Sequence, residues 1–221
     1  MSRSVLITGG SRGIGLATAL RFAAAGDRVA ILARPSPELD AAGRSVPALA
    51  LPCDVRDVAA VDAAIAAIAR AHGPVEVLVN NAGISPRHRV ESHPLDAWDD
   101  VLAVNLRAPF LLARAVIAGM RAQGSGRIIN VSSVHGRAGA PELAAYCASK
   151  AGLIGFTQAL AEEVKADGIV VTALCPTSVD TRLLRGSGLA PETTAEEVAE
   201  AIFFLARAPA AIAGTALDMF G

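Results

Sequence analysis

A tyrosine and a lysine four residues apart could act together as an acid/base. The chain has a single tyrosine, Tyr146, and only two lysines, one of which is Lys150. In a helix, side chains at positions i and i+4 lie on the same face. A fixed ammonium charge beside a phenol favours the phenolate and lowers a pKa that is ordinarily about 10. The spacing therefore indicates an acid/base at Tyr146; the alternative is that Tyr146 only packs and Lys150 is only solvated.

A glycine-rich stretch near the N-terminus could hold a phosphate group. Gly9, Gly13 and Gly15 follow a short apolar run at residues 5–8 and precede an amphipathic stretch. They therefore stand between a predicted strand and the N-terminus of a predicted helix, where a tight turn and the helix dipole favour a pyrophosphate. The spacing differs from the Gly-x-Gly-x-x-Gly fingerprint, so an ordinary strand-to-helix turn stays an alternative.

Two arginines indicate which dinucleotide this stretch would bind. Arg12 lies among the glycines, and Arg34 directly follows the predicted second strand. An acidic residue at the end of that strand would bind a ribose 2′-hydroxyl, whereas an arginine accommodates a 2′-phosphate. Ala33 occupies the acidic place. The two arginines therefore favour NADP(H) over NAD(H), unless each is a solvated surface charge.

The elements that must position these residues alternate between strand and helix. Short apolar runs predict strands, and apolar residues at helical spacing predict helices. The predicted strands cover residues 5–8, 28–33, 48–53, 75–79, 127–131, 169–174 and 215–219, and the predicted helices 16–25, 38–44, 58–72, 96–123, 142–166 and 195–206. This alternation predicts an α/β fold: one Rossmann-type, doubly wound domain over residues 1–221, with a seven-stranded parallel sheet and helices on both faces.

Composition and charge argue against several classes of function. The 221 residues carry a formal net charge of −1 without a basic block, which disfavours nucleic acid or an anionic membrane as a partner. No apolar run reaches the roughly 18 residues that a transmembrane helix needs, and the N-terminal run is too short for a signal peptide. The three cysteines lack metal-ligand spacing. We therefore expect a cytoplasmic protein with reduced cysteines and with no metal, membrane or nucleic-acid partner.

Five motifs, in this order, resemble the short-chain dehydrogenase/reductase family in its compact single-domain type. They are Thr8-Gly9-x-x-x-Gly13-x-Gly15, Asn80-Asn81-Ala82-Gly83, Asn105, Ser133 and Tyr146-x-x-x-Lys150. The resemblance covers nearly the whole chain, including the separation of thirteen between the serine and the tyrosine. It implies an oxidoreductase that uses NADP(H) on a ketone or secondary alcohol. The branches most similar are the 3-oxoacyl-acyl-carrier-protein reductases and the carbonyl or xylulose reductases.

The resemblance implies a role for each catalytic residue. Tyr146 would be the general acid in reduction, and Ser133 would donate a hydrogen bond to the same carbonyl oxygen. Lys150 would lower the pKa of the tyrosine and bind the nicotinamide ribose. Asn105, within the helix predicted at 96–123, would anchor a water in a proton relay. His135 is a candidate substrate contact beside Ser133 and Tyr146.

Cofactor-binding residues are implied in the same way. Asp54 would contact the adenine, and Thr181 the nicotinamide carboxamide. The implied set is Gly9, Ser11, Arg12, Gly13, Ile14, Gly15, Arg34, Asp54, Val55, Asn81, Ala82, Gly83, Tyr146, Lys150, Pro176, Thr177, Val179 and Thr181. Thr177 departs from the glycine that the family usually carries after the proline. The substrate loop, at about 181–193, is short.

Two alternatives to a small-molecule carbonyl reductase stay open. The first is a regulator that senses NADP(H) without turnover. The second is 3-oxoacyl-acyl-carrier-protein reduction, which favours a basic patch near the pocket. Candidates for such a patch are Arg87, Arg89, Arg137, Arg182 and Arg185.

Oligomerisation is expected from the two longest predicted helices. Those at 96–123 and 142–166 carry apolar residues on more than one face, which is typical of helices buried against a second subunit. The family resemblance points to a homotetramer, with a dimer as the alternative because the C-terminal tail is short.

Overall fold

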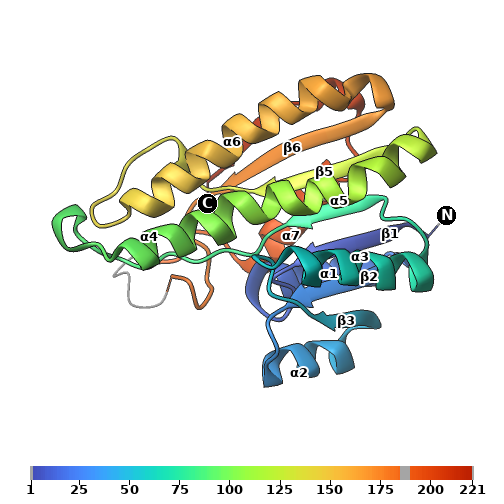
Figure 1. Cartoon of the computed structure of the whole chain (residues 1–221), viewed down its shortest axis with the longest axis horizontal. Coiled ribbons are helices and arrows are strands. Elements are labelled where there is room, and N and C mark those ends of the chain that lie inside the picture. The colour runs from blue at the N-terminus through green and yellow to red at the C-terminus, as the bar shows by residue number, and fades with distance from the viewer. Residues whose placement is uncertain (1, 185–189, 221) are drawn as a thin grey trace.

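Strands from all along the chain build one parallel sheet (Figure 1). The computed structural model describes residues 2–184 and 190–220, within which seven strands pair in the order β3-β2-β1-β4-β5-β6-β7. The strands are β1 (Ser4–Thr8), β2 (Arg28–Ala33), β3 (Ala48–Pro52), β4 (Val77–Asn80), β5 (Gly126–Val131), β6 (Ile169–Pro176) and β7 (Ala216–Met219). All six pairings are parallel. The predicted seven-stranded parallel α/β fold is confirmed.

Helices cover both faces of this sheet. One face carries α1 (Gly13–Ala24), α2 (Pro37–Ser45) and α7 (Ala195–Leu205), and the other carries α3 (Val58–His72), α5 (Ala108–Gln123) and α6 (Ala144–Val164). Successive side chains of a strand point to opposite faces, so Ile7 of β1 joins the first core and Leu6 the second. Strands buried on both faces are continuous apolar runs, which is why the sequence reveals them.

The loops that follow the strands gather at one edge of the sheet. In an open α/β sheet, ligands bind at the carboxyl ends of the strands where the strand order reverses. The order reverses here between β1 and β4, which pair from Val5 with Val77 to Ile7 with Val79. The loops after β5 and β6 lie with the short helix α4 (Leu95–Leu102) on the left-hand side of Figure 1. The fold therefore brings the predicted motifs to one side of the molecule.

The helix predicted at 96–123 is continuous but not uniform. It begins as α4, widens into the π-helical turn η2 (Ala103–Arg107) and continues as α5. The stretch Leu95–Gln123 is, by length and composition alone, apolar enough to cross a membrane. A search for an uninterrupted apolar run misses it because charged residues interrupt it. In the fold, α5 packs its apolar side chains into the second core, which accounts for its composition.

Most element boundaries differ from the prediction by one to three residues, and two of these differences have a visible cause. The helix expected from residue 142 begins at Ala144, because Glu142 adopts a φ of 65°, in the left-handed region that ends regular helix. The strand expected at 75–79 is Val77–Asn80. Asn80 belongs to the strand since it pairs with Asn130, and its Nδ2 donates to Asn130 Oδ1 at 2.8 Å.

Candidate active site

Tyr146 and Lys150 lie one turn apart on α6, and both are buried. Tyr146 is 8% exposed and Lys150 4%. The Lys150 ammonium nitrogen is 5.6 Å from the centroid of the Tyr146 ring, and it donates a 2.7 Å hydrogen bond to the carbonyl oxygen of Val131, the last residue of β5. The pair therefore faces the sheet, and the reading of Lys150 as a solvated surface residue is wrong.

Ser133 approaches the tyrosine from the end of β5. It precedes the 3₁₀ turn Val134–Gly136, and its Oγ accepts a hydrogen bond from the backbone N–H of His135 at 3.1 Å. Its hydroxyl also hydrogen-bonds the Tyr146 phenol and thereby lowers the pKa of that phenol. Two residues thirteen apart in sequence are thus joined because β5 and α6 pack side by side.

Burial has the largest effect on both ionisable groups of the site. It raises the pKa of Tyr146 from 10.0 to about 12, against a lowering by Ser133. It lowers the pKa of Lys150 from 10.5 to about 8. Lys150 is not among the groups that shift the Tyr146 pKa in the protein alone, so the expected lowering by the lysine is not seen there. Burial acts in these two directions because loss of water disfavours the charged form of each group.

Asn105 ties three elements together from the π-helical turn. It is fully buried. Its Nδ2 donates to the carbonyl oxygen of Ile84 at 2.9 Å and to Ser149 Oγ at 3.1 Å, and its Oδ1 accepts from the Ile84 N–H at 2.9 Å. Ser149 Oγ in turn donates to the Tyr146 carbonyl oxygen at 2.7 Å. Ser149 was missed by sequence reasoning, although it lies one residue before Lys150.

The loop after β4 borders the candidate catalytic residues. A Cβ at Gly83 would lie 3.5 Å from Asn105 Oδ1 and 3.8 Å from Lys150 Nζ. The backbone N–H groups of Asn81 and Ala82 both donate to Thr8 Oγ1 at 3.0 Å. The predicted Asn81-Ala82-Gly83 segment thus connects the glycine-rich stretch to the candidate catalytic residues.

The glycine-rich stretch makes a cradle that a larger side chain would fill. Gly9 has a φ of +67°, and a Cβ at Gly15 would lie only 2.2 Å from the Gly9 carbonyl oxygen. Ser11, Arg12 and Ile14 lie in the same turn, and Arg12 precedes α1 without capping it through its side chain. Backbone amides at an uncapped helix N-terminus suit an anion. These residues fit the pyrophosphate of a dinucleotide.

The two predicted arginines each act on a carboxylate that follows a strand at this edge of the sheet. Arg12 lowers the pKa of Glu38 at the start of α2, and so does Arg182, which lies 3.7 Å from that carboxylate; the backbone and Ser36 hydrogen bonds have larger effects. Arg34 adds a smaller lowering to the pKa of Asp54, beyond the β2–β3 edge. The charges of Arg12 and Arg34 therefore act on groups that follow β2 and β3.

Asp54 is held mainly by a residue that the sequence reasoning missed. The Arg56 guanidinium donates hydrogen bonds to both carboxylate oxygens, the shortest being 2.7 Å from Nη2 to Oδ2. These side-chain hydrogen bonds are the largest cause of the lowered pKa of Asp54. Arg56 also bonds Asp100 at 2.6 Å. The neighbouring Val55 is buried. The proposed adenine contact therefore has a fixed orientation.

The segment after β6 reaches back over the glycine-rich stretch. Thr177 N–H donates to the Met219 carbonyl oxygen at 3.0 Å, directly after Pro176. Val179 is buried, and a Cβ at Gly13 would lie 3.2 Å from the methyl group of Thr181. Part of the predicted substrate loop, residues 185–189, lies outside the described residues.

His135 is half-buried on the 3₁₀ turn beside Ser133. Its Nδ1 is buried without a hydrogen-bond partner among residues 2–184 and 190–220. The structure thus places His135 next to Ser133, a candidate catalytic residue. Within the same residues, no three His, Cys, Asp or Glu side chains gather as a metal site.

Known proteins are similar to this chain in sequence and in fold. The short chain dehydrogenase family model matches residues 3–191. 2-(R)-hydroxypropyl-CoM dehydrogenase of Xanthobacter autotrophicus is 38% identical, covering 100% of this chain and 98% of the relative. Acetoacetyl-CoA reductase of Shinella zoogloeoides is 41% identical over 84% of this chain and 77% of the relative. A variant of actinorhodin polyketide ketoreductase with NADPH has a TM-score of 0.93 at 33% identity, covering 100% of this chain and 98% of that one. The chain belongs to the short-chain dehydrogenase/reductase family, as its motifs predicted.

Proposed function

We propose that this oxidoreductase is NADP(H)-dependent and transfers hydride between the nicotinamide and a ketone or secondary alcohol, with Tyr146 as general acid/base. The observation that carries the proposal is the buried cluster of Ser133, Tyr146 and Lys150, braced by Asn105. Family membership and the relatives named as ketone reductases support this reaction class. The substrate would be a small-molecule carbonyl compound or alcohol.

Each catalytic residue acts at the carbonyl oxygen or through Tyr146. When bound, the dinucleotide supplies or accepts the hydride. In reduction, Tyr146 gives its proton to the carbonyl oxygen, and the Ser133 hydroxyl donates a hydrogen bond that stabilises the negative charge developing there. Lys150 favours the resulting phenolate, and a water anchored near Asn105 would return the proton. The positive charge of an oxidised nicotinamide would further lower the Tyr146 pKa that burial raises.

NADP(H) would lie along the carboxyl edge of the sheet. The amides of the glycine-rich stretch would hold the pyrophosphate, and Arg12 and Arg34 the 2′-phosphate. Thr181 would hold the carboxamide. The structural neighbour with NADPH supports this choice of cofactor.

Turnover tests the reaction. NADPH absorbance is followed against a panel of ketones, and Tyr146→Phe is expected to lose about 10²–10⁴-fold in kcat while its NADPH affinity changes little. Full activity in that variant would contradict the mechanism. If the wild type binds NADPH tightly but reduces no ketone, the protein is a sensor instead.

Cofactor preference has its own test. Removing a cation that pairs with a phosphate costs about 1.5–3 kcal/mol, or roughly 10–100-fold, so Arg12→Ala and Arg34→Ala should lose that much NADPH affinity. NADH affinity should stay nearly unchanged. Arg70→Ala, at an exposed arginine of α3, is the control. A wild type with higher catalytic efficiency for NADH than for NADPH would refute the assignment.

The acyl-carrier-protein alternative depends on a free basic patch. Three of the five candidate arginines instead have acidic neighbours: Arg89 with Glu91 at 3.7 Å, Arg137 with Asp218 at 2.8 Å and Arg182 with Glu38 at 3.7 Å. Arg185 lies outside the described residues. Paired charges attract an acidic carrier less strongly, which favours a small-molecule substrate.

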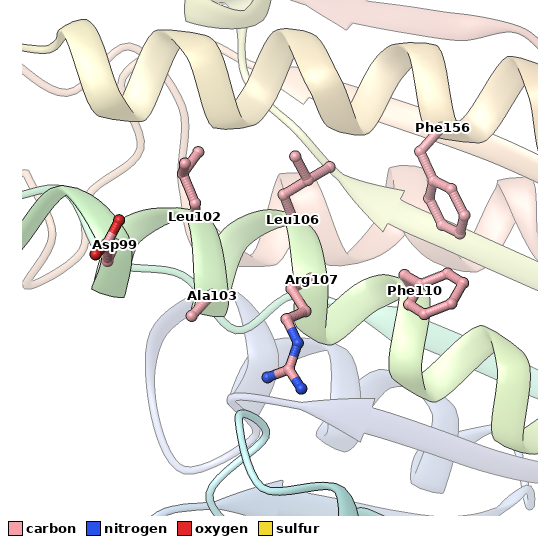
Figure 2. A pocket seen from close by; sticks show the side chains of 7 residues that line it. All are labelled: Asp99, Leu102, Ala103, Leu106, Arg107, Phe110 and Phe156. Atoms are coloured by element: carbon pink, nitrogen blue, oxygen red, sulfur yellow. The ribbon is translucent and has the colours of Figure 1, made fainter.

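We also propose that the protein is a homo-oligomer, with a second copy against α4, α5 and α6. Figure 2 shows the side chains that line an apolar hollow of about 430 Å³ there: Asp99, Leu102, Ala103, Leu106, Arg107, Phe110 and Phe156. The two phenylalanine rings meet edge to face at 6.3 Å, and Phe110 is 47% exposed. In a two-fold dimer this same surface would meet its own copy.

Sedimentation measures this association. Phe110→Asp places a charge in the apolar hollow and should shift the wild-type dimer or tetramer to smaller species, whereas Phe204→Asp, at an exposed phenylalanine of α7, tests whether any exposed apolar residue has this effect. A monomeric wild type would refute the interface.

A further inference from the structure

Two limbs of the chain, one at each end of the substrate loop, are joined by hydrogen bonds. Residues 177–180 leave the sheet after β6, and residues 190–194 return beside them; together they are called the clasp. The backbone N–H groups of Glu192 and Thr193 both donate to the Ser178 carbonyl oxygen, at 2.9 and 3.1 Å. The clasp therefore joins the two limbs at the base of the loop.

One side-chain hydrogen bond in the clasp involves the position where this chain departs from its family. Thr177 Oγ1 donates to Glu192 Oε2 at 2.9 Å. The Thr177 N–H is anchored to the Met219 carbonyl oxygen of β7, so the donor is fixed to the sheet. On the returning limb, Thr194 caps α7 in a capping box, so the limb that carries the acceptor is fixed to a helix. A glycine at residue 177 would lack the hydroxyl, so the bond depends on this chain's own threonine.

The outgoing limb determines where Thr181 lies. Thr181 directly follows the clasp, and its methyl group lies against Gly13 in the glycine-rich stretch. Two residues earlier, Val179 is buried and pairs with Thr193 of the returning limb. Because the limbs are bonded to each other, a loosened clasp would let Thr181 shift relative to the glycine-rich stretch.

We propose that Thr177 and Glu192 are a positioning pair, which holds Thr181 in place for the nicotinamide end of the cofactor. The pair acts on the cofactor through Thr181. The inference rests on the proposed function for the role of Thr181, and on the described hydrogen bonds for everything else.

The test measures NADPH affinity and backbone protection, neither of which needs a substrate. Thr177→Val removes the hydroxyl at constant shape, Glu192→Ala removes the acceptor, and Thr177→Ser restores a donor. Thr215→Val, at an exposed threonine before β7, is the matched control. NADPH dissociation constants come from nicotinamide fluorescence, and hydrogen exchange reports the Glu192 and Thr193 amides.

Because each change removes one hydrogen bond, Thr177→Val and Glu192→Ala should bind NADPH about threefold to tenfold more weakly. Both amides should also exchange faster in these two variants. Thr177→Ser should behave nearly like the wild type. In a Thr181→Ala background, Thr177→Val should cost nothing further. Wild-type affinity and exchange in both single variants would overturn the proposal, as would an equal loss in the Thr181→Ala background. If the wild type turns over no ketone, the proposed reaction is refuted but the effect of the variants on NADPH binding still stands. If the wild type turns over ketones but the Thr177 and Glu192 variants bind NADPH normally, only the positioning role of the pair is refuted.

Discussion

The only tyrosine of the chain makes the protonation state of Tyr146 directly measurable. Burial raises its pKa from 10.0 to about 12 in the protein alone, a difference worth about 3 kcal/mol between the two protonation states. At about pH 11, roughly nine tenths of Tyr146 should therefore stay protonated in the native protein. An exposed tyrosine at that pH is roughly nine tenths ionised.

Near-ultraviolet absorbance of the phenolate, followed against pH, measures this difference. Tyr146 should ionise at a higher pH in the native protein than in the same chain in urea. Circular dichroism on the same samples identifies the pH range in which the protein stays folded. Tyr146→Phe contains no tyrosine and should show no step. Because the native state keeps its proton between about pH 10 and 12 while the unfolded chain loses it, this group makes the fold less stable as pH rises through that window.

Adding NADP⁺ should move the native step to lower pH, because a positive nicotinamide beside the phenol favours the phenolate. A native step at or below the ordinary pKa in the protein alone would show that burial does not govern Tyr146. A step that NADP⁺ leaves in place would show that the cofactor's positive ring lies elsewhere.

Two further perturbations follow from the same geometry. Burial lowers the pKa of Lys150 from 10.5 to about 8, so stability should rise by about 3 kcal/mol between those pH values; urea unfolding should show that Lys150→Met loses this rise and that the exposed Lys165→Met keeps it. Gly15→Ala would set a Cβ 2.2 Å from the Gly9 carbonyl oxygen. It should cost about 1–3 kcal/mol of stability and should also weaken NADPH binding. The control is Gly155→Ala, in open space on α6, which should stabilise the protein by about 0.5–1 kcal/mol. Equal unfolding midpoints for the two alanine variants would contradict the reading of the cradle.

Much of the fold was predictable because its signals are local. Strands buried on both faces appear as short apolar runs, and their alternation with helices leaves few topologies. The boundaries that failed have individual causes: Glu142 takes a left-handed conformation before α6, and Asn80 is held in β4 by Asn130. Neither cause is visible in periodicity.

The candidate site divides in the same way. Types and spacing singled out Tyr146, Lys150 and Ser133, since a helix places i and i+4 together and the family motif supplies the serine. Ser149 and Arg56 were missed, because their importance comes from partners on other elements: Asn105 for the first and Asp54 with Asp100 for the second.

The sheet, the glycine-rich stretch and the pairing of Tyr146 with Lys150 depend on residues close together in the chain, so the amino-acid sequence was enough to predict them. The direction of the Tyr146 pKa shift required the folded molecule, since burial is set by atoms contributed from several elements at once. The folded molecule was also needed to join Thr177 to Glu192, fifteen residues away. Sequence spacing specifies which side chains share a helix face, but the water around them is removed by packing.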